Sequence, residues 1–134
     1  MGNARIATEL LQIARKLVAV KRTLADYAGD DEELADDLES ALSRFISGSS
    51  EVNGDEVMFY EESTRKGEMV RIEITVNPNN QPSRTGKTLI GLSITGEEGA
   101  PTYEDGIWDF EEYESVRSVA KVIGGVTKRI LRKW

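Results

Sequence analysis

The sequence predicts an α+β fold in which helical segments at both ends of the chain flank an antiparallel sheet. Apolar residues recur at alternating intervals of four and three near the start of the chain, as they do on one face of a helix. They alternate with polar residues in the middle, as in half-buried strands, and return to a helical period near the end. At 134 residues the chain has room for one domain with a sizeable core but not for two. We therefore expect a single domain over 1–134, with a helical region at 1–47, an antiparallel sheet at 55–110 and a C-terminal amphipathic helix at 113–134.

The first helix is predicted to carry a three-heptad apolar seam. Its members are Ile6, Leu10, Ile13, Leu17, Val20, Leu24 and Tyr27. A seam that repeats on average every ~3.5 residues suits a second helix running alongside it. That partner is either the next helix of the same chain or a second copy. We expect a homo-oligomer, a dimer in the simplest case, built at least partly on this seam.

The second helix is predicted to begin at Asp30, with Glu33 as its capping-box partner, and to end at the polar segment 47–50. Ala28 and Gly29 between the two helices favour a short turn and hence an N-terminal helical hairpin. One long bent helix is the alternative, and the sequence leaves it open.

The middle of the chain is predicted to form a three- or four-stranded antiparallel β-meander. The predicted strands are 56–62, 70–76, 89–94 and a short edge strand at 107–110. Asn53 and Gly54 are a turn signal before the first of them. The clearest alternation places Ile72 and Ile74 on the core face, and a one-residue slip would move both to the solvent.

The last helix is predicted to be strongly amphipathic. Its face opposite the apolar residues carries a basic ridge of Arg117, Lys121, Lys128 and Arg132. Gly124 and Gly125 in its middle each weaken a helix by about 1 kcal/mol, which predicts either close packing against another backbone or a kink. The core predicted from all segments contains Leu10, Leu17, Leu38, Phe45, Ile72, Ile74, Ile90, Leu92, Val119, Ile123 and Ile130.

The composition excludes most catalytic chemistries. Since the chain has neither His nor Cys, it cannot form a Ser-His or Cys-His nucleophile, a thiolate zinc site or a His-ligated haem. We therefore expect a non-enzymatic protein with no cofactor and no metal, and a carboxylate–metal enzyme is the remaining catalytic alternative. No apolar run approaches the roughly 18 residues of a membrane span. Glu9, Arg15 and Lys16 interrupt any signal-peptide core, so we expect a cytoplasmic protein without membrane contact.

The charge of the chain, −7 in total, is segregated along the sequence. The net charges are +3 for 1–28, −10 for 29–70, −6 for 71–115 and +6 for 116–134. The basic ends and the acidic middle should attract each other, within one chain or between copies. An acidic chain without aromatic residues in its basic ridge is not typical of nucleic-acid binding, so we expect the ridge to meet an acidic helix of its own or another subunit.

The segment 81–88 imitates the end of a phosphate-binding P-loop but lacks the required context. Gln81 occupies the position of the first glycine, and a strand rather than a helix is predicted to follow. We therefore reject nucleotide hydrolysis. The loop at 77–87 is nevertheless long for a hairpin, and Arg84 and Lys87 are candidates for contacting a partner. They also support an alternative function, a small-ligand or nucleotide-binding module that uses this loop as a lid.

Six acidic residues crowd the start of the second predicted helix. They are Asp30, Asp31, Glu32, Glu33, Asp36 and Asp37. They lack the spacing of an EF-hand loop and lie on one helix rather than converging from several elements. We interpret them as a solvated and well-capped helix start, with partner binding as the alternative.

Residues 5–19 read RIATELLQIARKLVA. This segment resembles a helix that begins many small proteins of large tailed bacteriophages, with the pattern R-I-A-x-E-L-x-x-I-A-R-x-L. The resemblance covers about 15 of the 134 residues and implies a phage or prophage origin. It brings no catalytic residues, because the pattern contains none.

The predicted function rests on three observations: the missing catalytic residue types, the excess of helical apolar surface and the segregated charge. We expect a non-enzymatic protein-interaction or assembly protein, and the resemblance implies a phage or prophage accessory or structural factor. Such a protein would bind a protein partner in the host-cell cytoplasm or the virion.

Overall fold

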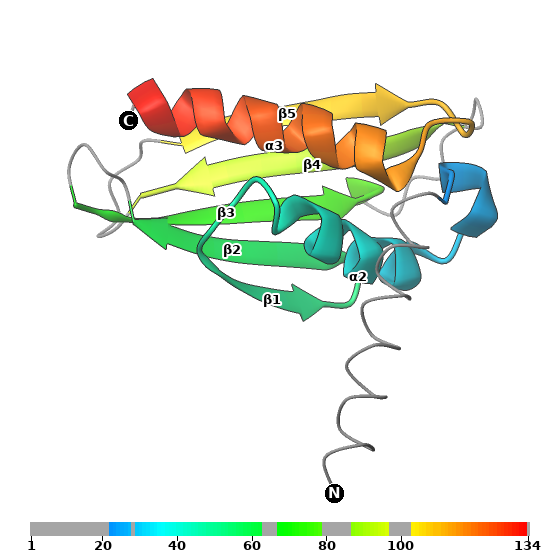
Figure 1. Ribbon diagram of the computed structural model, residues 1–134, viewed down its shortest axis with the longest axis horizontal. Coiled ribbons are helices and arrows are strands. Elements are labelled where there is room, and N and C mark those ends of the chain that lie inside the picture. Colours follow the sequence, from blue (N-terminus) through cyan, green and yellow to red (C-terminus); the bar gives the residue numbers. More distant parts are fainter. Residues whose placement is uncertain (1–21, 28, 63–66, 79–86, 97–102, 134) are drawn as a thin grey trace, which may run out of the picture.

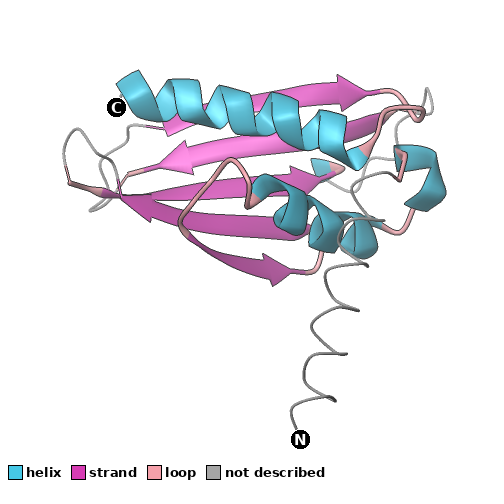
Figure 2. Cartoon of the chain, in the orientation of Figure 1, coloured by secondary structure: helices cyan, strands magenta, loops and turns pink. Residues whose placement is uncertain are grey.

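The computed structural model of the chain describes residues 22–27, 29–62, 67–78, 87–96 and 103–133. It has an α+β fold, in which two α-helices lie on one face of a five-stranded antiparallel sheet (Figure 1). The elements in chain order are η1 (Leu24–Tyr27), α2 (Asp31–Leu42), β1 (Ser49–Asn53), β2 (Glu56–Glu62), β3 (Met69–Val76), β4 (Thr88–Thr95), β5 (Tyr103–Phe110) and α3 (Val116–Lys133). Figure 2 shows the same two layers, with the helices in front of the strands.

The sheet is a simple meander in which each strand pairs with the next along the chain. Val57 pairs with Ile74, and Ile74 in turn pairs with Leu92, so that apolar residues line up across the central strands. All three are almost completely buried, as are Ile72 and its neighbours on the same face. The alternation of buried and exposed residues confirms the predicted core face of β3, because a one-residue slip would expose this whole set.

The number of strands differs from the prediction of three or four. The additional strand is β1, which lies in a segment that was predicted to end a helix. Helix α2 ends at Leu42, and Ile46 reaches the core from the turn that follows instead of from the helix. Gly48 then allows the chain to pass close to β2, since a Cβ at this position would lie 1.9 Å from the carbonyl oxygen of Tyr60. The formation of β1 therefore depends on its contact with β2, a segment that follows later in the chain.

Strand β5 is also longer than predicted, beginning at Tyr103 rather than at residue 107. Its glycine is covered by an aromatic ring, because a Cβ on Gly106 would lie 2.6 Å from the indole of Trp108. Trp108 packs against the core and faces Ile90 of β4. The predicted edge strand is thus confirmed in position and corrected in length.

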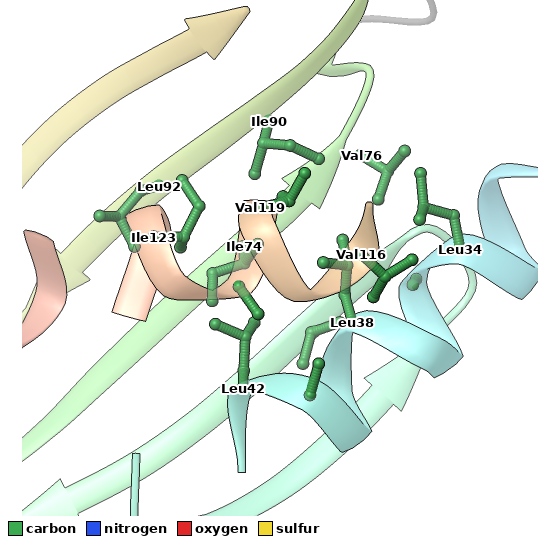
Figure 3. Close-up of a cluster of buried hydrophobic side chains, with 14 of the residues drawn as sticks. Leu34, Leu38, Leu42, Ile74, Val76, Ile90, Leu92, Val116, Val119 and Ile123 are labelled. Atoms are coloured by element: carbon green, nitrogen blue, oxygen red, sulfur yellow. The ribbon is translucent and has the colours of Figure 1, made fainter. Parts of the chain in front are cut away.

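The core lies between the sheet and the two helices (Figure 3). Leucines of α2, valines and an isoleucine of α3, and branched residues of β3 and β4 meet there. Of the predicted core, the residues found buried are Leu38, Ile72, Ile74, Ile90, Leu92, Val119 and Ile123. Phe45 and Ile130 are partly buried against this cluster, and Leu10 and Leu17 lie outside the described residues.

The predicted N-terminal hairpin is described only at its connection. Residues 22–27 are not part of an α-helix, because backbone amides of this segment donate hydrogen bonds to the segment before α3. The amide of Leu24 donates to the carbonyl of Glu114 at 2.9 Å, and Thr23 forms an isolated bridge with Ser115. One continuous helix through this region into α2 is therefore excluded, and the prediction that the first helix extends to Tyr27 is wrong.

Helix α3 begins at Val116, three residues later than predicted, because Ser115 caps it. The Ser115 hydroxyl accepts a hydrogen bond from the amide of Ser118 at 3.1 Å, the usual geometry of a helix N-cap. Of the two alternatives predicted for Gly124 and Gly125, close packing or a kink, the structure shows close packing at Gly124. A Cβ on Gly124 would lie 2.6 Å from the Cβ of Phe45, whereas one on Gly125 would meet nothing within 4 Å. The close neighbour is thus a side chain rather than a backbone.

Candidate functional site

The basic ridge of α3, formed by Arg117, Lys121, Lys128 and Arg132, lies on the exposed side of the helix, and all four side chains are exposed. Lys128 places its ammonium 5.7 Å from the centre of the Phe45 ring, within cation–π distance. Among the described residues, the other three cations of the ridge have no ion-pair partner. The ridge is therefore a positive surface that the described part of the chain does not neutralise by direct contact.

Four acidic residues of α2 form two groups, an outer group of Glu32 and Asp36 and an inner group of Glu33 and Asp37. Both outer acids are exposed, and neither forms an ion pair within the described part of the chain. Asp30 has the predicted capping role, since its side chain accepts a hydrogen bond from the amide of Glu33 at 3.1 Å. Glu33 does not complete the capping box, because its carboxylate is used elsewhere.

The inner acids of α2 bind the cationic side chain of Arg22, which no local sequence pattern marks. Arg22 places its guanidinium 2.6 Å from the carboxylate of Glu33 and 3.6 Å from that of Asp37. It also lies 4.2 Å from the centre of the Tyr27 ring and donates to the carbonyl of Asp26 at 3.0 Å. Arg22 thereby ties the segment before α2 to the helix, which is a structural rather than a catalytic arrangement.

Tyr27 is the most strongly perturbed titratable group of this cluster. Its ring is buried, and its hydroxyl donates a hydrogen bond of 2.6 Å to Asp37. Burial and the neighbouring carboxylate both disfavour a phenolate, so the pKa of Tyr27 is held well above its usual range. A phenol that stays protonated at neutral pH acts here as a hydrogen-bond donor and not as a base.

Of the two candidate loop residues, the structure describes only Lys87. Arg84 lies outside the described residues, whereas Lys87 pairs with Glu111 at 3.1 Å. This pairing raises the pKa of Lys87 above its usual value. The ammonium is thus held against the end of β5, and the proposed lid function of the loop stays a prediction.

Asn77, at the start of the same loop, makes an unforeseen structural contact. Its amide nitrogen donates to Asp31 of α2 at 3.0 Å, and its amide oxygen accepts from the backbone of Leu89 at 2.9 Å. Its φ of 46° lies in the left-handed region, which Asn tolerates better than most residues. Asn77 therefore fastens the β3–β4 connection to the start of α2.

The residues of the predicted oligomer seam have different positions in the fold. Leu24 is buried in the core of its own chain, so its side chain is not available to a second copy. Tyr27 is buried in the same core. Ile6, Leu10, Ile13, Leu17 and Val20 lie outside the described residues. The part of the seam that is described thus belongs to the fold rather than to an interface.

The face of the sheet opposite the helices has a mixed and mainly acidic surface. Exposed Ile107 and Met69 provide its most accessible apolar side chains, at 60% and 40% exposure. Arg71 forms an ion pair of 2.8 Å with Glu73 across the same surface. Partial burial and the nearby Glu73 raise the pKa of Glu56. This face therefore combines carboxylates with isolated apolar side chains and has little free positive charge.

Neither a metal centre nor a spanning helix is found among the residues that the structure describes. No three of their carboxylates come together as a group that could hold a metal ion. None of their helices is both long enough and apolar enough to cross a lipid bilayer.

Comparisons with known protein families, with curated proteins and with solved structures find no match to this chain. The functional assignment therefore rests on the charges and contacts described above.

The side chains that sequence reasoning missed share a feature. Arg22 and Glu33 are 11 residues apart, and Asn77 and Asp31 are 46 apart, so no local spacing marks these pairs. The preference of Asn for the left-handed region was the one available signal for Asn77.

Proposed function

We propose that the chain is a non-enzymatic protein-interaction or assembly protein that binds a protein partner through the charged outer surface of its helical layer. The observation that carries this proposal is the basic ridge of α3. Its cations Arg117, Lys121 and Arg132 are exposed and have no ion-pair partner among the described residues. Complementary charge steers partners and selects among them, so an unneutralised ridge suits recognition.

The absence of His and Cys from the whole sequence supports a non-catalytic role. The resemblance of residues 5–19 to phage proteins extends the proposal to an accessory or structural factor of a phage or prophage. Such a factor would act in the host-cell cytoplasm or in the virion.

Affinity capture with matched variants tests this proposal. The wild type is compared with a ridge variant carrying Arg117→Gln, Lys121→Gln and Arg132→Gln, which removes charge but retains helix-forming residues. A control variant, Glu51→Gln with Asp109→Asn, removes charge from exposed positions of β1 and β5. We expect a partner that is retained by the wild type and the control and lost from the ridge variant. Failure to recover any partner from host lysate and from the virion fraction would contradict the proposal.

A further inference from the structure

We infer that the helical layer is the interface of a twofold-symmetric dimer, in which the basic ridge of α3 of each copy lies against the outer acids of α2 of the other. This inference rests on the proposed function and names its partner as a second copy of this chain.

The first argument is the charge of α3. All six charged residues of segment 116–134 are basic, so the helix contains no acid of its own that could neutralise the ridge. Val122, 41% exposed on the same helix, provides apolar surface beside the cations. A partner for this surface should therefore be acidic.

The second argument is that α2 provides a surface of matching spacing. Its inner acids are occupied, because Arg22 binds Glu33 and Asp37. The outer acids Glu32 and Asp36 are exposed and four residues apart, which places them on neighbouring turns of one helix face. Arg117 and Lys121 on α3 are also four residues apart. The two acids and the two cations therefore have the same spacing along their helices and can form two contacts side by side.

The third argument is geometric. Helices α2 and α3 lie side by side on one face of the sheet, and both begin beside the segment 22–27, so they run in the same general direction (Figure 1). A twofold axis between the helices and parallel to them places α2 over α3 of the second copy, and α3 over its α2. The acid–base contact is then made twice, as an isologous interface requires. A twofold axis in the same plane but perpendicular to the helices would instead place like charges together.

The expected dimer is weak and salt-sensitive. Exposed ion pairs contribute little individually, and salt screens them. We expect a concentration-dependent mass above 14.9 kDa at low salt, and a dissociation constant that rises at least about tenfold when NaCl is raised from about 50 to about 500 mM.

A charge-swap experiment tests the pairing itself by light scattering and sedimentation equilibrium. Variant A carries Arg117→Glu and Lys121→Glu, and variant B carries Glu32→Lys and Asp36→Lys. Each variant alone opposes like charges at both contacts, so we expect its dissociation constant to rise by roughly 100-fold. An equimolar mixture of A and B restores opposite charges at both contacts and should give a heterodimer within about tenfold of the wild-type affinity.

A control variant changes net charge without touching the interface. Glu51→Lys with Asp109→Lys shifts the net charge by the same amount as variant B, but at exposed positions of β1 and β5. It should leave the dissociation constant unchanged. Circular dichroism of each variant checks that it is folded. If variant B fails to fold, the salt dependence of the wild-type dissociation constant tests the inference instead. A salt-sensitive dimer supports the inference, and a salt-independent dimer overturns it.

Several results would overturn the inference. These are a wild type that remains at 14.9 kDa at low salt and about 100 μM, a mixture of folded A and B that stays monomeric, or a dimer that neither variant weakens. A dimer dissociated only by Leu17→Glu would place the interface on the predicted N-terminal seam. A monomeric chain that still captures another protein through the ridge would refute this dimer and leave the proposed function standing.

Discussion

Single residues of α3 differ in ways that a substitution can measure, and the glycine pair is the clearest case. Gly124 lies against Phe45, whereas Gly125 has open space where a Cβ would be. Alanine at either position should gain up to about 1 kcal/mol of helix stability. Only Gly124→Ala should also incur an overpacking cost of about 1–3 kcal/mol, because the Phe45 side chain must move.

The prediction is therefore a difference between two matched variants. Gly125→Ala should raise the urea midpoint of unfolding. The free energy of unfolding of Gly124→Ala should be about 1–3 kcal/mol lower than that of Gly125→Ala. Equal midpoints for the two variants would mean that Phe45 does not resist the added methyl group.

A second prediction at this scale concerns the phenol of Tyr27 and the pH. Tyr27→Phe removes the hydrogen bond to Asp37, and a bond to a charged group contributes about 1.5–3 kcal/mol, so the variant should be less stable by about that amount at pH 7.

The difference should depend on pH in a defined direction. The folded-state pKa of Tyr27 is raised, so the unfolded chain ionises first, near pH 10, and the contribution of this phenol is fully present below that pH. Above pH 10 the advantage of the wild type should fall by about 1.4 kcal/mol per pH unit. Urea unfolding of both proteins between pH 7 and pH 11.5 measures this, and a constant difference over that range would contradict it.

At the scale of elements, Asn77 determines how the β3–β4 connection meets α2. Asn77→Ala loses both side-chain hydrogen bonds and places a Cβ at a φ of 46°, so we expect a cost of about 2–4 kcal/mol. Asn77→Gly loses the same bonds but relieves the backbone, and should cost about 1 kcal/mol less than alanine. Thermal or urea unfolding of the pair separates backbone strain from hydrogen bonding. Alanine that is tolerated better than glycine would show that the left-handed conformation is not a constraint.

At the scale of the whole molecule, the meander places its strands in very different environments. Strand β3 is hydrogen-bonded on both sides and has four buried side chains, whereas β1 is a five-residue edge strand with exposed positions. Local opening should therefore release β1 before β3. We expect amide hydrogen exchange in β3 to be at least about 100-fold slower than in β1. Equal protection of the two strands would indicate that the sheet opens only as a unit.

Much of the fold could be predicted because its signals are local. The alternation around Ile72 and Ile74 specifies the face of β3 that is buried, and Asp30 starts α2 by capping an amide three residues away. The candidate site was predictable only as far as the basic ridge, since a helical period places those cations on one side of α3. Arg22 was not found, because its partners on α2 are neighbours only after folding.

The α+β class, the buried faces of the central strands and the amphipathic character of α3 could thus be predicted, and His- and Cys-based chemistry excluded, without tertiary information. These depend on periodicity and composition, which short segments express without reference to the rest of the chain. Tertiary contacts alone establish that Gly48 leads into an edge strand, that Leu24 belongs to the core, and that Arg22 binds only the inner acids of α2. Each of these depends on contacts between segments distant in sequence, where the free energy of packing outweighs local preference.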